Sequence, residues 1–292
     1  MSPARVVLLT ALAMLAFAGN SLLCRIALKQ TSIDAASFTT IRLMSGALML
    51  GLLLRWRGRS AVAGGNWPSA FALFVYAAGF SFAYIRLSAA TGALLLFGAV
   101  QATMIGYGVW RGERLARPQL AGFVLALGGL VGLMLPGLAA PPLVSALLML
   151  GAGLAWGIYS LRGKGAGDPT QVTAGNFLRA VPITAALSLL MVNELSLDRA
   201  GVGYAVLSGA LTSGLGYAIW YQALPALKAT QAAIVQLSVP VLAAVGGIVL
   251  LGEPISWRMA LASGAILGGI ALVILEKKQT NAIGGRTDRL KD

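Results

Sequence analysis

The segment Leu87-Ser88-Ala89-Ala90-Thr91 recurs 140 positions later as Leu227-Lys228-Ala229-Thr230-Gln231. Further along, the pair Gly112-Glu113 recurs at the same offset as Gly252-Glu253. The run Leu127-Gly128-Gly129-Leu130 is matched by Leu267-Gly268-Gly269-Ile270, again 140 positions later. Three matches in the same order and at one offset indicate that the chain is built from two related halves.

Around these matches the chain is apolar almost throughout. Only 11% of its 292 residues are charged, whereas about a quarter would be charged in a soluble domain. Each apolar stretch is close to the ~20 residues that cross a membrane as a helix, and helices satisfy their own backbone groups there. The sequence therefore predicts an all-α membrane protein with ten transmembrane helices. They are expected near residues 5–27, 34–54, 67–86, 89–110, 118–136, 142–161, 170–192, 200–221, 229–251 and 256–275.

Five helices fall in each half, and an odd number makes the second half enter the membrane from the opposite side. The prediction is two inverted five-helix repeats, residues 1–138 and 139–276, followed by a basic cytoplasmic tail at 277–292. Weaker matches agree in order. They pair Asp34 with Asp168, Arg42 with Arg179, and Phe80-Ser81 with Trp220-Tyr221. In secondary transporters, repeats of this kind place the substrate site where the halves meet.

The net charge of +13 could suggest nucleic-acid binding, but the positions of the basic residues argue against it. With the N-terminus in the cytoplasm, 15 of the 22 Lys and Arg residues fall on the inner side and 5 on the outer side. This bias follows the positive-inside rule. It predicts a multi-pass protein of the bacterial inner membrane with both termini cytoplasmic, in contact with the lipid bilayer and not with nucleic acid.

The first apolar stretch resembles a signal peptide, with small residues at Ala16-Phe17-Ala18. However, Leu12–Ser21 has a counterpart at Leu150–Tyr159 in the middle of the chain, so the segment is expected to be retained. Gly153-x-x-x-Gly157 allows close helix contact, either within one chain or between two copies, and both a monomer and a homodimer remain open.

With its five-plus-five helices, its Asp34…Arg42 pattern and its paired Gly-Glu motifs, the chain resembles the drug/metabolite transporter superfamily, of the EamA type. The resemblance covers nearly the whole chain, to about residue 276. It implies export of small metabolites through a central cavity by alternating access. Trp156-Gly157-Ile158-Tyr159 and the aromatic third helix are most similar to bacterial amino-acid exporters of the YddG type.

Polar side chains inside membrane helices are costly and usually face the interior of the bundle. Gln236 is the most suggestive, because Pro240 removes the hydrogen bond that its carbonyl would accept and could act as a hinge. A simple packing kink, with Gln236 bonded to a neighbouring helix, is the alternative. The polar candidates for substrate binding are Asn20, Gln101 and Gln236, with Asn176 and Gln231 as further intramembrane polar residues.

Aromatic side chains form the second set of candidates. They are spaced three or four apart and therefore share helix faces. Tyr and Trp often lie in the belt at the membrane surface, but Trp156 is well inside its helix, where its ring could receive an ammonium group. The aromatic candidates for substrate binding are Tyr76, Phe80, Tyr84, Trp156, Tyr159, Tyr217, Trp220 and Tyr221.

Four charged residues near or inside the helices are interpreted as architectural. Arg42 and Arg179 are expected to reach the membrane surface or pair with a carbonyl, in preference to binding a substrate carboxylate. Glu113 and Glu253 are expected at the N-terminus of the following helix, where a carboxylate is favourable.

The residue types that the chain lacks argue against several classes of function. The chain has no histidine, and its carboxylates fall near segment ends, so a proton relay, a metal site or a catalytic triad has no support. The sequence predicts neither an enzyme nor a cofactor, but a uniporter of small neutral or zwitterionic metabolites, amino acids in particular. A drug or sugar carrier of the same fold is the alternative. A membrane-embedded lipid-modifying enzyme or a non-transporting scaffold is disfavoured.

Overall fold

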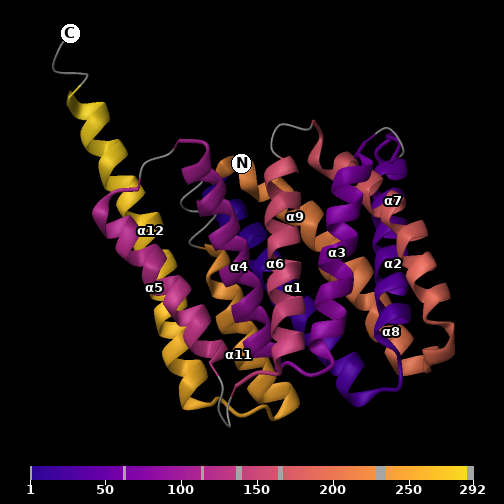
Figure 1. Ribbon diagram of the computed structural model, residues 1–292. Helices are drawn as coiled ribbons and strands as arrows, with labels where there is room; N and C mark the ends of the chain where they lie inside the picture. The colour runs from indigo at the N-terminus through magenta and orange to yellow at the C-terminus, as the bar shows by residue number, and fades with distance from the viewer. Residues whose placement is uncertain are drawn as a thin grey trace.

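A computed structural model describes residues 2–61, 64–112, 115–135, 140–163, 167–227 and 235–287. All regular structure in these ranges is helical, which confirms the all-α prediction (Figure 1). The longer helices are α1 Pro3–Gln30, α2 Ala35–Trp56, α3 Trp67–Tyr84, α4 Ala89–Trp110, α5 Arg117–Met134, α6 Leu143–Gly163, α7 Pro169–Leu190, α11 Ser238–Leu251 and α12 Trp257–Thr287. The shorter ones are η1 Val192–Glu194, α8 Arg199–Leu207, η2 Ser208–Leu215, α9 Gly216–Ala223 and η3 Leu224–Ala226.

The helices have the length and composition of membrane spans. Among the described residues, seven helical runs are long and apolar enough to cross a membrane, and one of them is the continuous run Arg199–Ala226. Ser238–Leu251 and Trp257–Leu272 are shorter apolar helices. The protein is therefore a multi-pass helical membrane protein. Glu113 and Gln231, which the sequence singled out, lie outside the described residues.

Acidic caps set where several helices begin. Asp34 accepts a hydrogen bond from the Ser37 backbone N–H at 2.8 Å, and Asp168 accepts one from the Gln171 N–H at 2.9 Å. These bonds satisfy N–H groups that have no partner within the helix. The recurrence of Asp34 and Asp168 in the sequence thus has a local cause, because each one starts the helix that carries Arg42 or Arg179.

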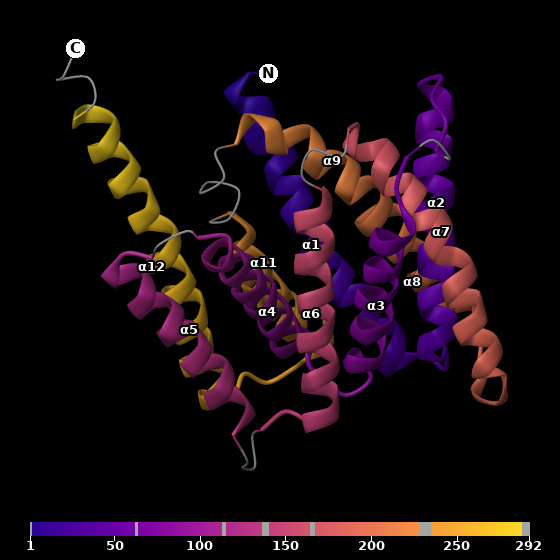
Figure 2. The same cartoon turned by 45° about the horizontal axis from the view of Figure 1, so that its top comes forward.

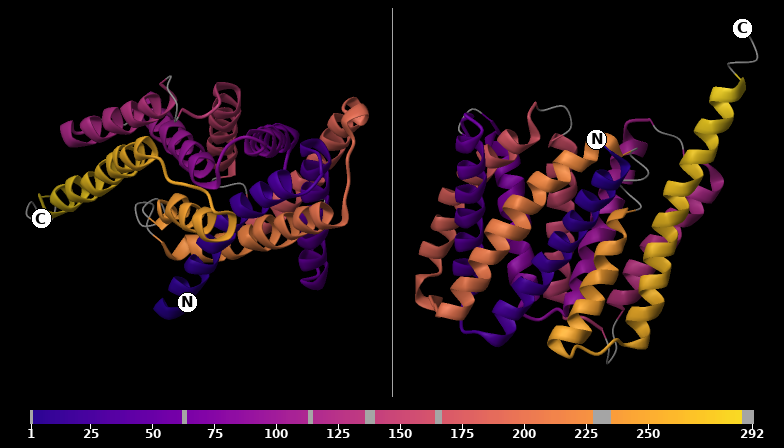
Figure 3. Two further views of the ribbon diagram at one scale, coloured as in Figure 1. Left: turned by 90° about the horizontal axis from the view of Figure 1, so that it is seen from below. Right: turned by 180° about the vertical axis from the view of Figure 1, so that it is seen from behind.

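The bundle has two opposite faces. Helix α1 begins and α12 ends at the same face, here called the terminal face (Figure 1). The α5–α12 pair forms one side of the molecule and α2, α7 and α8 form the other (Figure 2). Helices α1, α3, α4 and α6 lie between them, and the views from below and behind show the same arrangement (Figure 3). Helix α12 continues to Thr287, so the segment expected as a basic tail begins as helix.

The run predicted as one regular helix over 200–221 changes from α-helix to π-helix in its middle and then back to α-helix. Ser208–Leu215 forms a π-helix, η2, which is wider than an α-helix and is often found at functional sites. It packs directly on α2. A side chain at Gly209 would overlap the backbone carbonyl of Arg42, so glycine is required for this approach. In α6, Gly153 and Gly157 similarly pack on α4, which is a contact within one chain.

Candidate functional site

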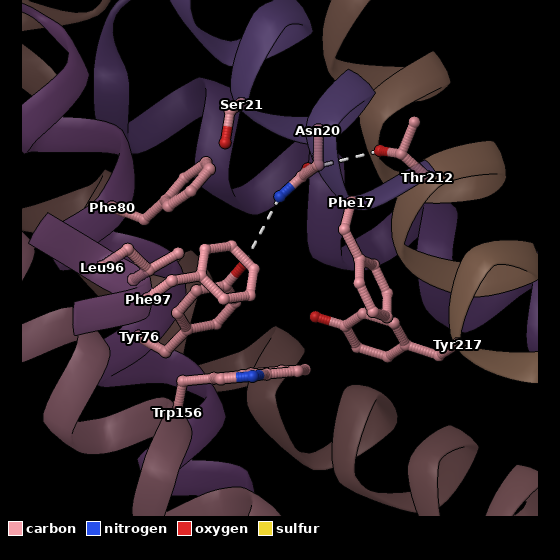
Figure 4. Close-up of a pocket in the computed structure, with 10 residues that line it drawn as sticks. All are labelled: Phe17, Asn20, Ser21, Tyr76, Phe80, Leu96, Phe97, Trp156, Thr212 and Tyr217. Atoms are coloured by element: carbon pink, nitrogen blue, oxygen red, sulfur yellow. Dashed lines mark hydrogen bonds between the residues drawn. The ribbon is translucent and has the colours of Figure 1, made fainter. Parts of the chain in front are cut away.

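A small cavity lies at the centre of the bundle, between α1, α3, α4, α6, η2 and α9 (Figure 4). Its volume is about 20 Å³, which accommodates about one water molecule. The described conformation is therefore closed around its centre. The cavity is lined by Phe17, Asn20, Ser21, Tyr76, Phe80, Leu96, Phe97, Trp156, Thr212 and Tyr217.

Aromatic rings build most of the cavity wall. The ring centroid of Trp156 lies 4.8 Å from that of Tyr76, 5.4 Å from Tyr159 and 5.0 Å from Tyr217. Phe17 meets Tyr217 edge-on at 5.8 Å. These separations are in the range where aromatic pairs attract each other beyond simple burial. Aromatic residues that the sequence placed on three separate helices thus converge on one point.

Asn20 supplies a polar corner to this wall. Its side-chain amide donates a hydrogen bond to the Tyr76 hydroxyl at 3.3 Å. Its carbonyl oxygen accepts a hydrogen bond from Thr212 at 3.3 Å (Figure 4). It accepts another from Ser208 at 2.7 Å. Both hydroxyls belong to η2, so the π-helix holds Asn20 in place beside the cavity.

Arg42 lies directly behind Tyr76 and Phe80, and only 1% of it is exposed. Its guanidinium donates to the Tyr76 hydroxyl at 3.1 Å and to the Ser213 hydroxyl at 3.3 Å. It also lies over the rings of Tyr76 and Phe80, 5.3 and 4.9 Å from their centroids. The expectation that Arg42 reaches the membrane surface or pairs with a carbonyl is wrong, since the aromatic and hydroxyl groups of α3 and η2 hold it inside.

Arg179 behaves as the sequence predicted. One terminal nitrogen of its guanidinium donates to the carbonyls of Gly64 at 2.6 Å and Gly175 at 2.9 Å. It is partly exposed near the terminal face. The two matched arginines therefore have different surroundings, and only Arg42 adjoins the cavity wall.

Five of the eleven substrate-binding candidates line the cavity: Asn20, Tyr76, Phe80, Trp156 and Tyr217. Three more support the wall from behind. Tyr84 meets Phe80 edge-on at 4.7 Å, Tyr159 stacks on Trp156, and Trp220 meets Phe17 at 6.0 Å.

The remaining candidates are outside the lining. Gln101 is buried on α4, and Tyr221 and Gln236 are half-buried. Pro240 lies in the first turn of α11, directly after an interruption of the helix at Leu237. A proline in a first turn removes no hydrogen bond from that helix. Its role as a hinge stays a prediction.

The sequence reasoning missed several residues that form the cavity wall or hold its polar groups. Phe17, Ser21, Leu96, Phe97 and Thr212 line the cavity, and Ser208 and Ser213 orient Asn20 and Arg42. A signal was present in the small and polar run Ser208–Gly214, which is unusual inside a membrane helix.

A buried ion pair lies at the face of the bundle opposite the termini. The Arg25 guanidinium donates to the Glu253 carboxylate at 2.8 Å, and to the carbonyls of Tyr84 and Ile85 at 2.9 and 3.0 Å. Glu253 also accepts from the Ala89 backbone N–H at 2.7 Å. Glu253 therefore caps the start of α4 and not that of the following helix, α12, as had been expected. Arg25 and Glu253, here called the latch, connect α1, α3, α4 and the segment after α11.

Comparisons with known proteins give a family match, two relatives and a solved structure of the same fold. The EamA-like transporter family matches residues 143–275. An uncharacterized protein of Pseudomonas aeruginosa is 64% identical over 92% of this chain and 94% of its own length. A threonine/homoserine exporter, RhtA, of Escherichia coli is 36% identical over 41% of each chain. One crystal structure shares the fold, with a TM-score of 0.69 and 20% identity over 96% of this chain and 99% of that one.

The apolar helices and the family match together define the class as a multi-pass membrane transporter. Residues 143–275 carry an EamA-like transporter domain of the drug/metabolite transporter superfamily.

Proposed function

We propose that this protein exports small neutral or zwitterionic metabolites, amino acids in particular, across the bacterial inner membrane. The observation that carries the proposal is the central cavity, where Trp156, Tyr76 and Tyr217 meet beside the polar group of Asn20. An aromatic wall can accept an apolar side chain and also the ammonium group of an amino acid. The threonine/homoserine exporter among its relatives favours the same substrate class.

The architecture that we propose is ten helices in two inverted repeats, with both termini cytoplasmic. Two observations support it. Helix α1 begins and α12 ends at the same face (Figure 1). Arg55, Arg57 and Arg59 at and just after the end of α2, and Arg162 at the end of α6, are at the terminal face, as the positive-inside rule requires of a cytoplasmic surface.

Transport would proceed by alternating access. A cavity of about 20 Å³ is too small for an amino acid, so the bundle must open for substrate to enter. The latch closes the face opposite the termini, and its release would open the cavity to the outside. The same fold could serve a drug or sugar carrier. A phosphorylated sugar is disfavoured, because its phosphate would call for several cations at the cavity. In the described part of the chain, Arg42 is the cation seen in contact with the lining residues Tyr76 and Phe80.

The test is counterflow of radiolabelled amino acids, including phenylalanine and threonine, in proteoliposomes of the purified protein. Trp156→Ala is expected to lower the apparent affinity about ten-fold through loss of the aromatic surface, while folding and membrane insertion stay intact. Trp56→Ala, which changes an exposed tryptophan at a helix end, is the control. Absence of flux for every amino acid in the wild-type protein would refute the proposal.

A further inference from the structure

One nitrogen of the buried Arg42 guanidinium has no partner. Nη2 donates to Tyr76 and Nε to Ser213, but Nη1 is buried and makes no hydrogen bond in the described part of the chain. An unpaired buried donor on a charged group costs free energy, so such a group calls for an explanation.

The charge of Arg42 also lacks an opposite charge. Within the described residues, ion pairs join Arg25 to Glu253 and Arg59 to Asp168, and neither includes Arg42. The rings of Tyr76 and Phe80 offset part of the cost, as does hydrogen bonding to two neutral hydroxyls. A cation inside a membrane protein is usually paired, and charged residues there commonly mark substrate pathways.

The place of Arg42 suits an anionic ligand in the central cavity. Tyr76 and Phe80 line the cavity on one side and contact the guanidinium on the other. The hydroxyl of Tyr76 accepts the hydrogen bond from Nη2, and Nη1 is the adjacent donor on the same planar guanidinium. A carboxylate that displaced the Tyr76 hydroxyl would meet both nitrogens, in the two-pronged geometry that arginine and carboxylates prefer.

We propose that Arg42 binds the carboxylate of the transported substrate once the cavity opens and Tyr76 releases Nη2. The inference rests on the proposed transport function and deepens it. It makes a free carboxylate the group that the protein selects, with the rest of the substrate against the Trp156 wall. Until a substrate arrives, the Tyr76 hydroxyl holds the place of one carboxylate oxygen.

The experiment compares three analogues that differ at one end. Labelled phenylalanine is exchanged in proteoliposomes against 3-phenylpropionate, which keeps the carboxylate, and against phenylalaninamide and phenethylamine, which lack it. In the wild-type protein the two compounds without a carboxylate are expected to compete about 10- to 100-fold more weakly than 3-phenylpropionate, as for loss of a charge-assisted hydrogen bond. Arg42→Gln should remove this difference, and Arg42→Lys, which keeps the charge without the fork, should restore part of it.

Arg179→Gln is the matched control, because Arg179 is held by backbone carbonyls away from the cavity. It should preserve the wild-type order of the analogues. A purely structural role for Arg42 would lower flux for all of them equally and leave their order unchanged, which overturns the proposal.

Thermal stabilisation of the detergent-solubilised protein by the same compounds gives a readout that needs no transport. If Arg42→Gln does not fold, Arg42→Lys and this wild-type series still decide the question. Flux of phenylalanine with equal competition by phenylalaninamide would overturn the role of Arg42 and leave the transport function intact. Stabilisation by 3-phenylpropionate without any flux would support the carboxylate site and refute transport of the amino acids tested.

Discussion

At the scale of single residues, the surroundings of a side chain decide what its charge can do. Arg42 and Arg179 match each other in the sequence repeat. Arg179 uses backbone carbonyls near the terminal face, whereas Arg42 has aromatic rings and hydroxyls around it at the centre. Backbone carbonyls hold Arg179, which is not among the residues that line the cavity. Arg42 retains a free donor beside the cavity.

Asp34 is a residue whose charge contributes to stability in a predictable pH range. Partial burial raises the pKa of its carboxyl, but hydrogen bonds from the N–H groups of Ser37 and Ser196 outweigh this and lower the pKa below its ordinary value. Because the folded-state pKa is the lower one, the stabilisation is fully present above about pH 4, the unfolded pKa. It is lost as the pH falls through the folded pKa.

Asp34→Ala is therefore expected to destabilise the protein by about 1 kcal/mol at neutral pH, as is usual for loss of a helix cap. Melting curves in detergent should show a constant difference from wild type between pH 8 and 5, and a shrinking one below about pH 4. Asp34→Asn, which keeps a neutral cap, serves as the control. A difference that persists unchanged at pH 3 would contradict the assignment of the stabilisation to the ionised carboxylate.

At the scale of helices, η2 is the element that organises the site. Its wider turn brings Ser208 and Thr212 to Asn20 and Ser213 to Arg42. Gly209 allows η2 to approach α2 closely enough for these bonds to form. The contact between η2 and α2 therefore controls both polar groups of the site.

Gly209→Val is expected to separate η2 from α2, with a loss of stability of about 1–3 kcal/mol typical of overpacking and a larger loss of transport. Gly203→Val is the matched control, because a side chain at position 203 meets open space in the same helical run. Melting temperature and counterflow are measured together on both variants. Normal transport by Gly209→Val would show that the site does not depend on this contact.

The helices were more predictable from the sequence than the site was. The length of an apolar stretch is almost enough by itself to predict a membrane helix. Residue type and spacing were also enough to select Tyr76, Trp156 and Tyr217, which the structure places in one cavity wall. The burial of Arg42 was not predictable, because its partners Tyr76 and Ser213 lie 34 and 171 residues away in the chain. The winding of η2 likewise depends on packing against α2, which no local pattern encodes.

At the scale of the whole molecule, the latch ties four segments together at one face. Glu253 is 6% exposed and Arg25 is buried with it, so removing one charge leaves the other unpaired. Breaking a buried pair in this way costs about 3–5 kcal/mol, enough to change which conformation is populated. Cys24, beside Arg25 and the chain's only cysteine, is fully buried in the closed conformation.

Glu253→Gln is expected to open this face and raise the rate at which a maleimide labels Cys24, with labelling of unfolded protein as the reference. Glu194→Gln removes the same charge from an exposed position and should leave the rate unchanged. Equal, slow labelling of wild type and Glu253→Gln would show that the latch does not hold the face closed.

The energetics of transport follow from the composition of the cavity wall. Among the described residues, none that lines the cavity carries a carboxylate or an imidazole, the groups that usually relay protons in transporters. A pH gradient alone, under clamped membrane potential, is expected to drive no accumulation of substrate in proteoliposomes. Concentrative uptake would instead direct attention to Glu253 and Glu113.

The intrinsic fluorescence of Trp156 is suited to report on the state of the central cavity. Three tyrosines surround this indole, and excitation passes readily from tyrosine to a tryptophan at such short range. Trp56, Trp67, Trp110 and Trp257 are exposed near helix ends, where their emission would hardly respond to events at the centre. Trp220, which contacts Phe17 behind the wall, is the other tryptophan that is not exposed, so the measurement uses a Trp220→Phe background. A change in fluorescence on adding substrate in that background, absent when Trp156 is also replaced by Phe, would follow the filling of the cavity in real time without an attached dye.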